Sequence, residues 1–133
     1  MGAWDFGPFD NDDASDWIYE LEESSDTSVI ADTLAAVTEA DADDLETLDC
    51  TNAIAAAEIV AALCGNPCAN LPDEAKAWVE ENEGLDASPL IPDALTVVKR
   101  IRTNSELKDL WDESKDAAKW YASLDDLTSR LKA

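Results

Sequence analysis

The chain has 133 residues, enough for one domain over residues 1–133 whose core needs neither disulfides nor a metal. It carries 31 Asp and Glu, 9 Lys and Arg and no His, and so a formal net charge of −22. A field of this sign repels nucleic acid and anionic membranes, and we expect direct binding of neither. Without His, nucleophilic catalysis has little support, and we expect a binding protein rather than an enzyme.

The charge is unevenly distributed along the chain. Residues 1–75 contain 19 acids and no base, whereas residues 76–133 contain 12 acids and all 9 bases. A base-free half would speed encounter with a cationic partner. Alternatively, the acidity only keeps the protein hydrated in a salty cytoplasm, where counterions screen the repulsion. We favour docking, because salt adaptation alone would spread the charge along the chain.

The first ten residues combine turn formers with aromatic side chains. Gly2, Gly7 and Pro8 oppose a regular element, yet the aromatic residues carry more apolar surface than a disordered tail would. The aromatic residues are Trp4, Phe6 and Phe9. We therefore expect a packed N-terminal arm, with Trp4 as a candidate binding residue.

An amphipathic helix is predicted to begin at Asp12. Its apolar residues recur at the spacing of a buried stripe, and its acids form the opposite stripe. The apolar stripe comprises Ala14, Trp17, Ile18 and Leu21, and the acidic stripe comprises Asp12, Asp16, Glu20 and Glu23. One interpretation is that these acids only start the helix and keep its outer face solvated. The other is that a basic partner docks on them.

The same acids raise the question of a divalent cation. Residues 10–14 begin like a calcium loop, but the fifth position is Ala and Ser15 replaces the turn glycine, which rejects an EF-hand. A looser Mg²⁺ or Ca²⁺ site using Asp12, Asp16 and Glu20 stays open. No other cofactor is expected.

Five further helices are predicted from apolar periodicity, caps and proline positions. They are Ser28–Glu39, Thr51–Cys64, Asp73–Asn82, a helix from Pro92 and a long helix from Ser105, with an acidic loop over residues 40–49. No window alternates apolar and polar residues long enough for a strand in a sheet. We therefore expect an all-α fold, a compact bundle of about six helices around the Ala-rich helix Thr51–Cys64. Its core should include Trp17, Ile54, Val60, Trp78, Leu95 and Trp111.

The last predicted helix carries two apolar stripes on different faces. One stripe comprises Leu107, Leu110, Trp111, Ala118 and Tyr121, and the other comprises Trp120, Leu124, Leu127 and Leu131. A straight helix cannot bury both stripes on one side. We therefore expect a kink or break near Ser123, where Ser123 and Asp126 make a capping-box pattern.

Glu58 is the only charged residue between Ala53 and Cys64. A buried carboxylate needs a partner or a raised pKa. One interpretation therefore makes Glu58 a ligand or proton acceptor that faces the N-terminal arm. The other is that this helix keeps one exposed line, which Glu58 marks.

The three cysteines are Cys50, Cys64 and Cys68, and their spacing in a chain without His opposes a structural zinc site. Cys64 and Cys68 flank a Gly-Asn-Pro turn and could form a disulfide, but cytoplasmic thiols stay reduced. We expect the cytoplasm, because no basic region followed by an apolar segment opens the chain.

Asn11-Asp12-Asp13-Ala14, together with Trp4 and the Gly7-Pro8-Phe9 run, resembles the start of a bacterial family catalogued as a domain of unknown function, number four-two-five-nine. Asp5 here replaces the Gly that usually follows the Trp. Residues 55–62 and 105–111 are also similar to the family's pattern, so the resemblance covers most of the chain. It implies a small bacterial or archaeal protein and no particular activity.

We therefore expect a small acidic cytoplasmic protein that binds or inhibits a basic protein partner, in the manner of an immunity protein or a nucleic-acid mimic. The candidate binding residues are Asp12, Asp16, Glu20, Glu23, Glu58 and Trp4. One alternative is a helical protein with a carboxylate Mg²⁺ or Ca²⁺ site, or a carboxylate-based enzyme. Another is an acidic scaffold whose charge is only salt adaptation.

Overall fold

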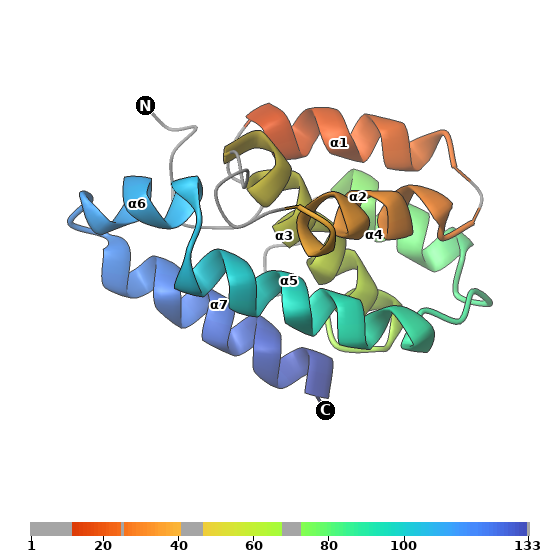
Figure 1. The fold of residues 1–133 in the computed structure, drawn as a ribbon. Helices are drawn as coiled ribbons and strands as arrows, with labels where there is room; N and C mark the ends of the chain where they lie inside the picture. The colour runs from red at the N-terminus through yellow and green to blue at the C-terminus, as the bar shows by residue number, and fades with distance from the viewer. Residues whose placement is uncertain (1–11, 25, 41–46, 68–72, 133) are drawn as a thin grey trace.

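A computed structural model of the chain describes residues 12–24, 26–40, 47–67 and 73–132. Within these ranges the backbone forms seven α-helices, one short 3-10 helix and no strand, which confirms the predicted all-α fold (Figure 1). The elements are α1 (Asp12–Glu22), α2 (Ser28–Thr38), α3 (Thr47–Leu63), α4 (Asp73–Glu81), η3 (Ser88–Leu90), α5 (Ile91–Thr103), α6 (Glu106–Asp112) and α7 (Ala117–Lys132).

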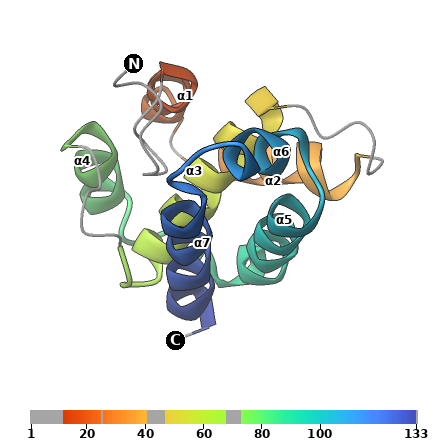
Figure 2. The ribbon, with the colours of Figure 1, turned by 90° about the vertical axis from the view of Figure 1, so that its left-hand side faces the viewer.

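Helix α3 is the centre of the bundle, because it contacts each of the other α-helices in the described ranges. Figure 2 shows α1 and α4 on one side of α3 and α2 and α5 on the other. Its fully buried alanines are Ala53, Ala55, Ala56, Ala57 and Ala61. Such short side chains let the neighbouring helices approach α3 closely from several directions. The prediction of a central Ala-rich helix is therefore confirmed, although α3 begins at Thr47 and not at Thr51.

The end of α3 follows from Gly65, whose φ of 94° is in the left-handed region that glycine adopts without strain. There the N–H groups of Gly65 and Asn66 donate to the carbonyls of Ala62 and Ala61, at 3.0 and 2.8 Å. These bonds satisfy carbonyls of the last helical turn. The turn also brings Asn66 to α7, where its side-chain amide donates to the carbonyl of Arg130 at 3.2 Å.

The predicted position of the break in the last helix is wrong. The break separates α6 from α7 at residues 113–116, and Ser123 lies inside α7, where its hydroxyl donates to the Trp120 carbonyl at 2.7 Å. The break brings the two apolar stripes together, since the rings of Trp111 and Trp120 stack with centroids 6.1 Å apart. The argument that one straight helix cannot bury both stripes therefore holds. Because the Ser123 hydroxyl bonds to a carbonyl of the preceding helical turn, Ser123 does not act as a helix cap.

Five of the six predicted core residues are buried: Trp17, Ile54, Val60, Trp78 and Trp111. Leu95 is only partly buried and packs against the core from outside. Leu110, expected on the buried stripe of α6, is 47% exposed. Two of the buried tryptophans satisfy their N–H groups, because Trp17 donates to the Thr33 hydroxyl at 2.7 Å and Trp78 to the Ser24 carbonyl at 2.9 Å.

The predicted aromatic arm, with Trp4, Phe6 and Phe9, lies outside the described residues. The same holds for most of the acidic loop between α2 and α3. Among the helices that the structure describes, none combines the length and the apolar character needed to cross a membrane.

Candidate functional site

The outer face of α1 is an exposed acidic surface. The opposite side of the helix is buried in the core through the side chains of Trp17, Ile18 and Leu21. Four residues on this outer side are exposed: Asp16, Tyr19, Glu20 and Glu23. We name this group the α1 acidic face. Their spacing places them on one side of the helix, within about 100° of each other. Asp12 begins α1, but its side chain lies outside the described part, so its membership of this surface stays a prediction.

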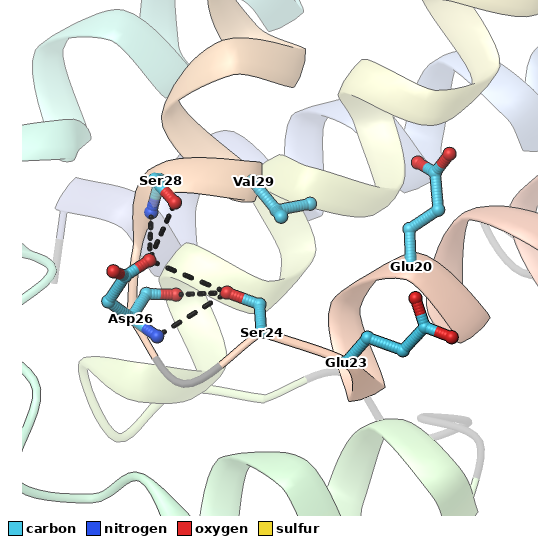
Figure 3. Close-up of a pocket in the computed structure, with 6 residues that line it drawn as sticks. All are labelled: Glu20, Glu23, Ser24, Asp26, Ser28 and Val29. Atoms are coloured by element: carbon cyan, nitrogen blue, oxygen red, sulfur yellow. Dashed lines mark hydrogen bonds between the residues drawn. The ribbon is translucent and has the colours of Figure 1, made fainter.

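The connection from α1 to α2 is held by short polar contacts. The Asp26 carboxylate accepts hydrogen bonds from the Ser28 hydroxyl at 2.6 Å and the Ser28 backbone N–H at 3.0 Å (Figure 3). The Ser24 hydroxyl donates to the Asp26 carbonyl at 3.0 Å. The bonds from Ser28 lower the pKa of Asp26 below its ordinary value of 3.8, so this carboxylate keeps its negative charge to a lower pH than a free aspartate does.

An open concavity lies between the C-terminal end of α1 and the start of α2. Its volume is about 510 Å³. The lining residues are Glu20, Glu23, Ser24, Asp26, Ser28 and Val29, drawn in Figure 3. Three of them are carboxylates and none is a base, so the hollow favours a cationic group. On the α4 side of α1, a second hollow of about 310 Å³ is lined by Glu22, Glu74, Ala77, Trp78 and Glu81.

The arginines of the second half of the chain are engaged elsewhere. Arg100 donates to the carbonyls of Val37 and Ala40, at the C-terminal end of α2. Ion pairs among the described residues include Arg102–Asp125, Lys108–Asp112, Lys119–Asp116, Arg130–Glu58 and Arg130–Asp126. None of these pairs includes an acid of the α1 acidic face. The negative charge of the α1 acidic face is therefore left without a counterion from the described part of the chain.

The structure gives no support to the carboxylate metal site. Within the described residues, no group of three His, Cys, Asp or Glu side chains is arranged to hold a metal ion. Asp16 and Glu20 lie one turn apart on α1, while the third candidate ligand, Asp12, has its side chain outside the described part. The trio of Asp12, Asp16 and Glu20 thus stays a sequence prediction.

Glu58 does not belong to the acidic surface. It is 2% exposed, so the interpretation that it marks an exposed line of α3 is wrong. Its two carboxylate oxygens accept hydrogen bonds of 2.6 and 3.0 Å from Arg130 of α7. Arg130 also donates to Asp126 at 2.8 Å. With both oxygens engaged by one guanidinium, Glu58 acts as an anchor between α3 and α7.

Burial raises the pKa of Glu58 above its ordinary value of 4.5, and the hydrogen bonds and charge of Arg130 offset only part of that effect. A carboxyl whose pKa is higher in the folded state binds its proton more readily there. The free energy of unfolding should therefore rise as pH falls through the raised pKa toward 4.5. Asp26, Asp86 and Asp112, whose pKa values are lowered from 3.8, lose their stabilising effect only below that value.

Mild acidification is thus expected to stabilise the protein. Denaturant unfolding at about pH 7 and about pH 5 should give the larger free energy of unfolding at the lower pH. Because neutralising surface acids also relieves repulsion, E58Q is the control, and its gain should be smaller than that of the wild type. An equal gain in both proteins would mean that Glu58 titrates as an exposed carboxyl does.

Sequence reasoning missed two features. Tyr19 is 66% exposed on the α1 acidic face, and its spacing from Asp16 and Glu23 was the signal that could have identified it. Arg130 as the partner of Glu58 had no local signal, because the two residues are 72 positions apart.

The cysteines and the arm complete the predicted candidates. Burial raises the pKa of the Cys50 thiol to about 11, so it behaves as an inert core residue. Cys64 is exposed and its thiol is free, so the disulfide that the sequence allowed is not formed here, whereas Cys68 itself lies outside the described part. Trp4 also lies outside it.

Comparison with curated proteins and with solved structures finds no match to this chain. One family model does match, and it spans residues 2–123, from the second residue to well inside α7. The resemblance seen in the sequence is thereby confirmed. The chain belongs to the family described as a domain of unknown function, DUF4259.

Proposed function

We propose that this protein is a small acidic binding protein that docks on a basic protein partner through the α1 acidic face. The observation that carries the proposal is the exposure of Asp16, Glu20 and Glu23 along one side of α1. No Lys or Arg of the described residues forms an ion pair with any of them. A cationic surface would supply the missing counterions.

The charges near the end of α1 also favour a cationic partner. The C-terminal end of a helix carries a partial negative charge and prefers basic side chains. Helices α5 and α7 follow this rule with Arg100, Arg102, Arg130 and Lys132 in their last turns. Helix α1, like α2, α3, α4 and α6, has no base in its last turn; it has Glu20 and Glu22 there and Glu23 directly after its end. A bound Lys or Arg would relieve this local repulsion.

Binding of this kind is governed by electrostatic steering. An acidic face raises the rate of encounter with a basic partner, and added salt lowers that rate. Carboxylates also compete with phosphates for the same Lys and Arg side chains. The proposal therefore extends to inhibition of a cytoplasmic protein that binds nucleic acid, or to neutralisation of a basic toxin.

The test is a pull-down from native lysate with the wild type, D16N/E20Q and D109N/E113Q as baits. The control variant D109N/E113Q also removes one Asp and one Glu charge, but from exposed positions on and beside α6. The wild type and the control should capture a basic protein that D16N/E20Q retains weakly. With the captured protein purified, D16N/E20Q should raise the Kd by about 2- to 30-fold at low salt, since each exposed charge pair contributes about 0.2–1 kcal/mol.

The difference in Kd between the wild type and D16N/E20Q should shrink when NaCl is raised from about 0.05 M to about 0.5 M, because the Debye screening length then falls to a few ångströms. Equal losses in both double variants would show that only net charge matters and would overturn docking on the α1 acidic face. Capture of no basic protein by any bait would favour the salt-adaptation alternative. Calorimetry of the wild type with Mg²⁺ and Ca²⁺ addresses the metal alternative. Saturable binding that D16N/E20Q abolishes would replace the docking proposal with a carboxylate metal site.

A further inference from the structure

Tyr19 is the most exposed large hydrophobic side chain among the described residues, at 66%. Asp16 lies three residues before it and Glu23 four residues after it, so both carboxylates share its side of α1. No hydrogen bond of the Tyr19 hydroxyl occurs within the described part. An aromatic ring exposed between carboxylates is a surface with room for a flat cation.

We propose that the α1 acidic face selects arginine side chains of its partner, with a guanidinium stacked on the Tyr19 ring and donating to the flanking carboxylates. This inference rests on the proposed docking function and names the chemical group that the partner presents.

The same protein already contains this arrangement on α7. There Arg102 lies over the ring of Tyr121, with its guanidinium carbon 5.0 Å from the ring centroid. The Nε of that arginine donates to Asp125 at 2.9 Å, and Asp125 lies four residues after Tyr121. One tyrosine and one carboxylate a helical turn apart thus hold one guanidinium between them.

Tyr19 and Glu23 repeat that spacing on α1, where the described residues supply no arginine. The Glu23 side chain is longer than that of Asp125 and reaches farther toward the ring, and Asp16 supplies an additional carboxylate as acceptor. The hollow between α1 and α2 is lined by Glu20, Glu23 and Asp26. Because Glu23 also follows Tyr19 by one helical turn, a second basic side chain has a place near the first. The fitting partner is therefore a segment with neighbouring arginines.

Arginine fits this face better than lysine. Its guanidinium is planar, stacks on an aromatic ring and donates to two carboxylates at once. A lysine ammonium is a strongly hydrated point charge that satisfies the acidic residues but gains less from the ring. Selectivity for arginine should therefore depend on Tyr19, whereas the general attraction for cations should depend on the acids.

The test measures, by calorimetry, the Kd of two synthetic peptides that have the same length, spacing and net charge, one with arginines and one with lysines. The wild type should bind the arginine peptide about two- to fivefold more tightly than the lysine peptide. Y19A should remove that preference and leave the affinity for the lysine peptide nearly unchanged. Y19F should keep the preference, because the ring and not the hydroxyl makes the contact.

Two controls separate this inference from the docking proposal. L110A truncates the other exposed large hydrophobic residue, on α6, and should leave both affinities unchanged. D16N/E20Q should weaken both peptides. Equal affinities of the wild type for the two peptides, or a preference that survives in Y19A, would overturn the arginine assignment and leave docking intact. If neither peptide bound the wild type, both proposals would be overturned. Circular dichroism checks that each variant is folded.

Discussion

Replacing Arg130 with alanine should lower the free energy of unfolding by about 3–5 kcal/mol, the range typical of a buried ion pair that loses one partner. The substitution would leave the Glu58 carboxylate, 2% exposed, without the guanidinium that engages both of its oxygens. It would also remove the contacts of Arg130 with Asp126 and with the carbonyl of Asn66. Urea unfolding followed by circular dichroism measures the change.

Arg102 provides the matched control. It also pairs with an aspartate, Asp125, but both side chains of that pair are well exposed. R102A removes this exposed pair and the contact of Arg102 with the Tyr121 ring, so it should cost no more than about 2 kcal/mol. The double variant E58M/R130M should recover most of the stability lost in R130A, because apolar side chains of similar volume need no counterion in a buried site. A small loss in R130A would indicate that Glu58 takes up a proton and tolerates the missing partner.

Replacing Ala56 with leucine should lower the free energy of unfolding by about 1–3 kcal/mol, the usual cost of inserting atoms into a packed core. Ala56 is fully buried in α3, which contacts each of the other described α-helices. A leucine there must displace a neighbouring helix or adopt a strained rotamer. Thermal and urea unfolding measure the effect.

Ala36, on the exposed side of α2, is the matched position for this experiment. Alanine and leucine have similar helix propensities, so A36L should change the free energy of unfolding by less than about 0.5 kcal/mol. If A56L were as harmless as A36L, α3 would have unfilled space around it. The close approach of neighbouring helices to its alanines would then not explain its composition.

The helical segments were largely predictable because their signals are local. The apolar spacing of Trp17, Ile18 and Leu21 defines a buried stripe without reference to the rest of the chain. Gly65 ends α3 because few other residues adopt its backbone conformation. The break between α6 and α7 was misplaced, since its position depends on how Trp111 meets Trp120. That contact is a tertiary one.

The acidic surface was predictable for the same reason. If one stripe of α1 is buried, the acids opposite it must face water, and the structure shows Asp16, Glu20 and Glu23 exposed. The role of Glu58 was not predictable, because an acid in an apolar helix can be either a solvent-facing residue or one half of a buried pair. Its partner, Arg130, is 72 residues away along the chain.

The sequence by itself determined the all-α class, the Ala-rich centre, the family and the uneven charge, since each depends on composition or on spacing within one helix. The tertiary structure alone decided which charges are paired. Tyr19 and Tyr121 each precede a carboxylate by four residues, yet only Tyr121 has an arginine over its ring. The physical reason is that a cation–π contact or an ion pair between helices requires two side chains to meet in space. Helix packing determines that meeting, and sequence spacing within either helix does not.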